Sequence, residues 1–374
     1  MTTDATTALA AERPLGELEL VARFDGAMLT GVTVSHQGRV FVNFPKWGDD
    51  VKFTVAEVRD GRHSAYPDQA TNDTDPDDLA GTLMSVQSVV VDPADRLWIL
   101  DTGRPLFEPT EYGGPKLVCV DLETDQVTRT ILFPQDVALR TSYLNDVRFD
   151  LRRGDEGMAF ITDSSDQGPN GIVVVDLASG ESWRRLHDHS STKYQGPATF
   201  VPVVEGRPLM EAEYGQANPL VMMGCDGIAI GADGERLFYC ALASRRLYSV
   251  ATDALADRSL DDEAVEATLL AEGDKGGAGD GLESDAEGYV YATNYEHNAV
   301  LRRARGGAWE TVVHDPRLLW PDTLSLATDG YLYVTANQLH RQADYQQGQD
   351  LRRKPYALFR IRIDAEPVLL GGRQ

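Results

Sequence analysis

Several signatures of common enzymes are absent from this chain of 374 residues. It has no GxSxG nucleophile elbow, no HExxH zinc motif and no GxxxxGK[ST] phosphate loop, and its glycine-rich stretch 273–281 does not fit GxGxxG. Serine hydrolases, zinc proteases and nucleotide-binding enzymes therefore lose their main support. Cysteine is also scarce: Cys119, Cys225 and Cys240 form an odd set without CxxC spacing, which argues against a disulfide framework or a structural zinc site.

Positive charge and long apolar runs are scarce too. The 35 Lys and Arg stand against 59 Asp and Glu, a formal net charge of −24, so the surface repels phosphates and anionic membranes. We therefore expect a small-molecule ligand as partner, and neither nucleic acid nor a membrane. The chain has no apolar run of about 18 residues and no N-terminal secretory pattern, which predicts a cytoplasmic location. The oligomeric state stays open.

One pattern, in contrast, occurs six times: a polar residue or glycine, a short apolar strand, a turn with Asp or Gly, and a second strand. The copies are 31–44, 87–101, 145–163, 226–240, 280–294 and 322–337. A hairpin of this size cannot bury its own apolar face, so stacked copies are typical of propeller blades. We predict an all-β fold, a six-bladed β-propeller with a central axial channel. It would form a single domain over residues 15–374, after a disordered tail over residues 1–14.

Further expectations concern segments outside the six hairpins. The alternating segment Leu18–Phe24 is predicted to join the last blade, because closing the ring removes an exposed sheet edge. Blade six is expected to contain strands over 357–363 and 368–370. The acidic, turn-rich segment 60–81 is predicted to be a surface loop, and the proline-containing insertion 188–224 is a candidate cover for the channel.

The residues that open the six inner strands are expected to surround one end of the channel. They are Gly31, Gln87, Asn145, Asp226, Asp280 and Asp322. Ligand sites are concave and carry a few convergent polar groups, so this funnel is the predicted site. The alternative for any single Asp or Asn is the capping of a local turn.

Two kinds of chemistry fit these oxygen-bearing side chains. Asp226 or Asp280 would act as the catalytic acid or base, because clustered carboxyl groups raise one another's pKa and leave one of them able to exchange a proton near neutrality. Alternatively, Asn145, Asp226 and Asp280 would bind one divalent cation, calcium or magnesium, which prefer oxygen ligands. Both hypotheses use the same residues, so both stay open. Trp320 or Tyr295 would stack on a substrate ring. The expected substrate-binding residues are Gln87, Asn145, Glu283, Asn294, Tyr295, Trp320 and Asp322.

Several motifs resemble those of a known family. They are AYPD (65–68), RLWILDTG (96–103), YLNDVRFD (143–150), LASRRLYSV (242–250) and WPDTLSLATDGYLYVTANQL (320–339). In these stretches the chain resembles the yellow / major royal jelly protein family. The resemblance implies a six-bladed propeller with a ligand channel along its axis. It also implies an activity like that of dopachrome-converting enzymes, which tautomerise an oxidised catechol, or the binding of biogenic amines.

A more distant resemblance is to the metal-dependent gluconolactonase propellers, through Asn145–Asp146 and Asp226–Gly227. It implies a lactone hydrolase with a divalent cation. The early glutamate ligand of that group is replaced here by Gly31–Val32. The implied ligand set is therefore one residue short unless Asp280, Glu283 or Asp322 takes its place. The leading hypothesis is therefore a yellow-type isomerase or tautomerase. The alternatives are a metal-dependent lactonase and an amine-binding protein without catalysis.

Overall fold

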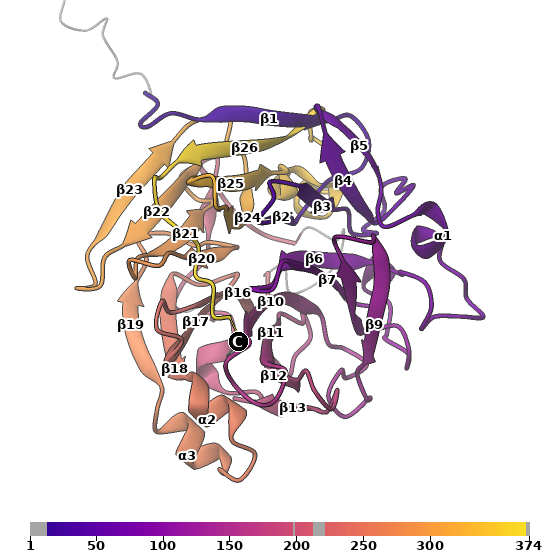
Figure 1. The fold of residues 1–374 in the computed structure, drawn as a ribbon. Helices are drawn as coiled ribbons and strands as arrows, with labels where there is room; N and C mark the ends of the chain where they lie inside the picture. The colour runs from indigo at the N-terminus through magenta and orange to yellow at the C-terminus, as the bar shows by residue number, and fades with distance from the viewer. Residues whose placement is uncertain (1–12, 197–198, 212–220, 372–374) are drawn as a thin grey trace, which may run out of the picture.

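Six four-stranded antiparallel sheets stand around a central axis (Figure 1). The computed structural model describes residues 13–196, 199–211 and 221–371. The architecture confirms the predicted six-bladed propeller, and each predicted hairpin forms the first two strands of one blade. All but the last two residues of the predicted disordered tail lie outside the described residues.

The first three blades follow one another along the chain. Blade one contains β2 (Val32–Val34), β3 (Val40–Asn43), β4 (Val55–Arg59) and β5 (Arg62–Ala65). Blade two contains β6 (Val86–Val91), β7 (Arg96–Asp101), β8 (Lys116–Asp121) and β9 (Gln126–Leu132). Blade three contains β10 (Leu144–Asp150), β11 (Met158–Asp163), β12 (Gly171–Asp176) and β13 (Ser182–Arg185).

The other three blades complete the ring. Blade four contains β16 (Cys225–Ile230), β17 (Arg236–Ala241), β18 (Arg246–Ala251) and β19 (Leu270–Asp274). Blade five contains β20 (Leu282–Ser284), β21 (Val290–Asn294), β22 (Ala299–Arg303) and β23 (Trp309–His314). Blade six contains β24 (Pro321–Leu326), β25 (Tyr331–Ala336), β26 (Tyr356–Arg362) and β1 (Glu19–Phe24).

The ring closes through its two chain ends, as predicted. β1 pairs antiparallel with β26, with Phe24 opposite Tyr356, and Figure 1 shows the indigo β1 beside the yellow β26. The prediction of a strand over 368–370 is wrong, because β1 already occupies the outer edge of β26. The C-terminal segment instead crosses one face of the propeller, where the backbone oxygen of Leu370 accepts from Leu151 N at 2.9 Å.

The prediction of a loop over 60–81 is also wrong in part. The segment contains β5 and the short helix α1 (Gln69–Asn72). Asp60 and Gly61 have positive φ values of 50° and 71°, which suits a tight hairpin turn between β4 and β5. The Asp-Gly pair at 60–61 thus marks a turn between two strands, and not the start of a long loop.

Apolar side chains pack between neighbouring blades. Each sheet alternates its side chains between two faces, and both faces are covered, so the buried residues form six clusters between blades. The innermost strands of adjacent blades are also in contact around the axis. This packing fixes where each inner strand begins.

Helical segments lie between and outside the strands. They comprise α2 (Thr252–Ala256) and α3 (Asp262–Glu266) in blade four, and the single turns Pro105–Phe107, Ser190–Thr192, Leu339–Arg341 and Ala343–Tyr345. The insertion 188–224 is described in part and contains a small hairpin, β14 (Val203–Val204) and β15 (Arg207–Pro208). Within the described ranges, no helix has the length and apolar character needed to span a membrane.

Candidate active site

A cavity of about 130 Å³ lies at the end of the axis where the inner strands begin. Its lining includes the residues that open five of the six inner strands: Gln87, Asn145, Asp226, Asp280 and Asp322. Each of the five is more than nine-tenths buried. Gly31, which opens the inner strand of blade one, is not among the described lining residues. The repeat thus places one amide-bearing or acidic side chain from each of five blades in a single cavity.

Bulges fall on the strand-opening residues in four blades. The pairing between the first two strands shifts its register at four places: Val86/Ser88, Leu144/Val147, Cys225/Ile228 and Pro321/Leu324. A bulge re-aims a side chain that regular alternation would send to a sheet face. The side chains at these positions reach the axial cavity for this reason.

Glycine lets neighbouring inner strands approach each other. A Cβ on Gly227 would lie 2.3 Å from the backbone oxygen of Asp280, and one on Gly281 would lie 2.5 Å from that of Asp322. Such contacts leave no room for a side chain. In each Asp-Gly pair, the Asp therefore supplies a carboxyl group to the cavity. The Gly leaves room for the backbone of the Asp in the next blade to approach.

Hydrogen bonds connect the polar groups of the cavity. Asn145 Nδ2 donates to Asp226 Oδ2 at 2.5 Å, and the Asp226 and Asp280 carboxyl groups share a further hydrogen bond. Trp320 Nε1 donates to Asp280 Oδ2 at 2.8 Å. The two carboxyl groups thus form a proton-sharing pair that is fixed from both sides.

Burial raises the pKa of the three aspartates that open inner strands at the cavity. The pKa of Asp280 rises to about 6, and hydrogen bonds from Asp226 and Trp320 limit the rise by favouring the ionised form. The pKa values of Asp226 and Asp322 rise well above the usual 3.8, because the negative charge of Asp280 adds to the effect of burial. The shared hydrogen bond raises the pKa of Asp226 and lowers that of Asp280, so Asp226 holds its proton more tightly than Asp280 does.

Aromatic side chains form another wall of the cavity. The Phe107 ring stacks near Tyr143 with centroids 5.0 Å apart, and near Trp47 at 5.7 Å. Tyr143 Oη accepts from Trp47 Nε1 at 2.8 Å and donates to Gln87 Oε1 at 3.0 Å. Tyr345 also lines the cavity. The sequence carries no periodic signal for this aromatic wall, because its residues lie in loops. Tyr143 alone belongs to a motif noted above, YLNDVRFD, two positions before Asn145.

Tyr295 and Trp320 lie behind the cavity wall. Both are fully buried, their rings stack with centroids 4.0 Å apart, and neither is among the residues that line the cavity. Trp320 has φ of 59°, a rare conformation for a bulky residue. The structure thus gives Trp320 a contact with Asp280, rather than an open face for a substrate ring.

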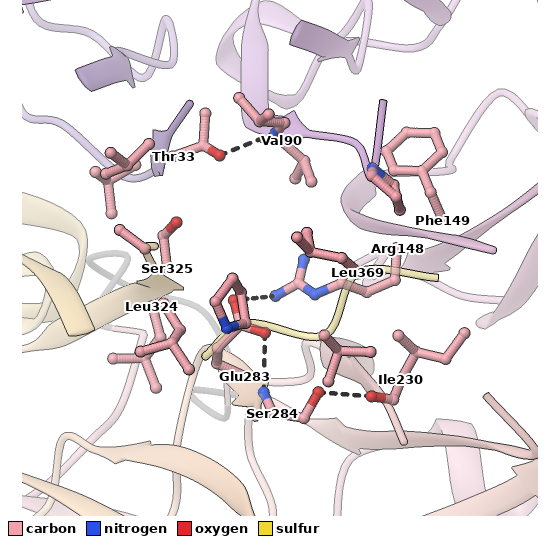
Figure 2. A pocket seen from close by; sticks show the side chains of 18 of the residues that line it. Thr33, Val90, Arg148, Phe149, Ile230, Glu283, Ser284, Leu324, Ser325 and Leu369 are labelled. Carbon is pink, nitrogen blue, oxygen red and sulfur yellow. Dashed lines mark hydrogen bonds and ion pairs between the residues drawn. The ribbon is translucent and has the colours of Figure 1, made fainter. Parts of the chain in front are cut away.

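Glu283 lies at a second cavity, of about 70 Å³, on the same axis (Figure 2). It is three residues beyond Asp280, roughly 10 Å along an extended strand. Its carboxyl group is 4.0 Å from Arg148 Nη2, and Arg148 Nη1 is paired with Asp146 Oδ2 at 2.9 Å. Burial raises the pKa of Glu283. Leu369, which follows blade six near the end of the chain, also lines this cavity.

Asn294 also lies apart from the carboxyl groups. It is buried at the end of β21 and borders an outer hollow with Lys275 and Trp309. A Cβ on Gly277 would lie 2.3 Å from both terminal atoms of the Asn294 side chain. Of the expected substrate-binding residues, Gln87, Asn145 and Asp322 share the axial cavity with Asp226 and Asp280.

The expected metal ligands meet in this cavity but bond to one another. Asn145 presents its amide nitrogen to Asp226, which in turn bonds to Asp280. Within the described ranges, no group of three or more His, Cys, Asp and Glu side chains is arranged to hold a metal ion. The oxygen-rich donor set has the chemistry that a hard cation prefers, once the amide turns its oxygen inward.

The fold and the cavity define a class of protein, a six-bladed propeller with buried carboxyl groups at one end of its axis. A family model described as major royal jelly protein matches residues 84–363. The chain belongs to this family. Major royal jelly protein 1 of Apis mellifera is 29% identical over 185 residues, which are 47% of this chain and 38% of that protein. Protein yellow of Drosophila melanogaster is 27% identical over 246 residues, 61% of this chain and 42% of that protein.

The chain therefore matches roughly two fifths of the length of these relatives. Among solved structures, the calcium-binding protein regucalcin of Agrobacterium tumefaciens has a TM-score of 0.57 at 15% identity, covering 95% of this chain and 98% of that one. A putative gluconolactonase has a TM-score of 0.57 at 11% identity, covering 94% and 93%. At these identities the likeness shows the propeller fold alone.

Proposed function

We propose that this protein is an isomerase of the yellow type, a tautomerase that moves protons on a small cyclic substrate bound in the axial cavity. The observation that carries the proposal is the hydrogen-bonded pair of Asp226 and Asp280, two buried carboxyl groups of which Asp226 holds its proton the more tightly. Acid and base catalysis on one substrate needs such a pair. The resemblance to dopachrome-converting enzymes suggests a catechol-derived ring.

The pair supports a balanced proton exchange. The Asp280 carboxylate takes a proton from one position of the substrate, and the Asp226 carboxyl group gives a proton to another. The product is an isomer, because the substrate loses and gains one proton. Afterwards the proton on Asp280 returns to Asp226 through the hydrogen bond between them. Asn145 holds Asp226 in place, and the aromatic wall offers a surface for the ring.

Turnover of dopachrome by purified protein tests this proposal. Asp280→Asn and Asp226→Asn should each lower kcat by a factor on the order of 10²–10⁴, the range expected for the loss of an acid or base group. Asp60→Asn is the matched control, since Asp60 is exposed in a turn and its positive φ suits Asn. Unchanged turnover in both cavity variants would exclude the catalytic roles.

A lactone hydrolase with a divalent cation is the second candidate. It is favoured by the oxygens of Asn145, Asp226 and Asp280, which line one cavity and would hold the ion. A bound cation would lower the pKa of a water molecule and so supply a nucleophile. Elemental analysis of protein purified without chelator tests this candidate. Stoichiometric calcium or magnesium that is lost in Asp226→Asn supports it, and metal-free protein with full activity excludes it.

The third hypothesis, an amine-binding protein without catalysis, differs in one measurement. Such a protein binds amines in the axial cavity but converts no substrate. Calorimetric binding of an amine by a protein that shows no turnover of dopachrome or of gluconolactone would favour it over both enzymes.

A further inference from the structure

The turn Pro105–Phe107, between β7 and β8, has a backbone that its sequence does not favour. Leu106 and Phe107 have φ values of 52° and 57°. Among the described residues, they are the one pair of adjacent non-glycine residues that both have positive φ. Bulky side chains rarely adopt this region, and such conformations cluster at ligand sites where surrounding contacts enforce them.

Contacts with two residues of the cavity wall and with two residues outside it hold this conformation. The Phe107 ring packs against both Trp47 and Tyr143, tilted by 23° and 22° from their planes, and these two rings are themselves 6.2 Å apart. The Arg104 guanidinium is 5.6 Å from the centre of the Phe107 ring. Leu106 N donates to Lys46 O at 2.9 Å. The backbone is thus held so that Phe107 completes the aromatic wall.

Arg104 is itself fixed. Its side chain is 1% exposed, and Nη1 donates to Asp166 Oδ1 at 2.8 Å and to Thr141 O at 2.9 Å. A buried, paired guanidinium is a rigid support for an aromatic ring. Phe107 is therefore positioned by three side chains, two of which line the same cavity.

Leu106, unlike the buried Arg104, is largely exposed to solvent. It lines the cavity, yet it is 62% exposed. A leucine left in water at the mouth of a concave site is apolar surface that a ligand can cover. Blade two, which carries this turn, is opposite blade five, which carries Asp280, in a ring of six. Leu106, Phe107 and Asp280 line the same cavity, so a ligand bound there lies close to both the turn and the carboxyl group.

We infer that Leu106 and Phe107 determine the specificity of the axial cavity: Phe107 is a fixed platform that selects an unsaturated ring, and Leu106 packs on the ring whatever its saturation. The inference rests on the proposed function for the location of the ligand. It concerns binding rather than proton transfer, so it is tested without turnover.

Matched ligand pairs separate the two roles. The probes are 2-phenylethylamine against 2-cyclohexylethylamine, and the neutral pair 2-phenylethanol against 2-cyclohexylethanol, all measured by calorimetry. The members of a pair differ in ring saturation but not in charge. Wild-type protein should prefer the phenyl member of at least one pair by about three- to tenfold, the affinity expected for one aromatic contact beyond its buried area.

Phe107→Leu should reduce that preference to about one. Leu106→Ala should weaken both members of a pair together by roughly tenfold, because it removes apolar surface that covers either ring. Tyr112→Leu is the control: Tyr112 lies five residues further along and is 61% exposed, but it does not line the cavity. It should leave both the affinity and the preference unchanged.

A ligand-free measurement tests the enforced backbone. Leu106→Gly should unfold at a temperature about 1–4 °C above Leu106→Ala, because glycine adopts positive φ without steric cost. A preference that survives Phe107→Leu, or a Leu106→Ala variant with wild-type affinities, overturns the inference. So does wild-type protein that binds none of the four probes. Loss of turnover in Asp280→Asn with the preference intact would leave the two proposals independently supported.

Discussion

The substitution Asp280→Asn should make the protein more stable at neutral pH while it removes the proposed base. In the folded state the pKa of Asp280 is about 6, against 3.8 for an ordinary aspartate. The folded protein therefore keeps a proton that the unfolded chain releases between about pH 4 and 6. A carboxyl group with a raised folded-state pKa lowers stability as pH rises through this window.

The magnitude follows from the difference between the two pKa values. At 1.36 kcal/mol for each pH unit, the wild-type protein loses about 2 kcal/mol of folding free energy through Asp280 as the pH rises from 4 to 7. Asparagine keeps the shape and can still accept from Trp320 Nε1, but it does not ionise. The stability of Asp280→Asn relative to wild type should therefore grow by about 2 kcal/mol between pH 4 and pH 7.

Urea unfolding of both proteins at several pH values measures this difference directly. Subtracting the free energy of unfolding of the wild type from that of the variant cancels the contribution of the many surface carboxyl groups, which both proteins share. Asp60→Asn should show no such pH-dependent gain, since Asp60 is exposed. A difference between Asp280→Asn and wild type that does not change with pH would refute the assignment of a raised pKa. A gain in stability together with a loss of turnover is the usual mark of a catalytic group.

Three further predictions concern the surroundings of the cavity. Trp320→Phe removes the N–H that favours ionised Asp280, so the lower limb of the pH–rate profile should move up by about 1–2 pH units; an unmoved limb would remove Trp320 from the network. Gly227→Ala should destabilise the fold by more than about 2 kcal/mol because its Cβ would meet Asp280 O, whereas Gly26→Ala, which has open space, should be nearly neutral in the same denaturation assay. Ionised Asp280 should make cationic or neutral ligands stabilise the protein more than aldonates or sugar phosphates do, and preferential stabilisation by anions in a metal-free thermal-shift panel would contradict this.

Local sequence pattern was enough to predict the blades. Each inner hairpin combines period-two alternation with a turn that contains Asp or Gly, and both signals act over a few residues. The closing role of Leu18–Phe24 was also predictable, because an alternating strand outside the repeats has only an open sheet edge to join. The prediction of a strand over 368–370 was wrong because the same edge cannot pair twice. The segment is short and apolar, but β1 already pairs with that edge of blade six.

Equivalent positions in the repeat also placed five polar side chains at one cavity before the structure was known. Depth along the axis was not predictable in this way. Glu283 lies in the same blade as Asp280, but a few residues along an extended strand carry it toward the second cavity. Residues at equivalent positions of different blades lie at the same depth along the axis. Residues close together in one strand can lie at different depths.

The contacts between blades and loops were decided only by the tertiary structure. Trp320 has a positive φ and stacks on the buried Tyr295 behind Asp280, and no periodic signal in the sequence indicates such a backbone turn. Trp47 and Phe107 reach the cavity from loops of different blades. The sequence by itself determined the repeat, the closure and the ring of polar residues, since these depend on short-range pattern. The protonation of that ring depends on burial and on neighbours far along the chain, which exist only in the folded protein.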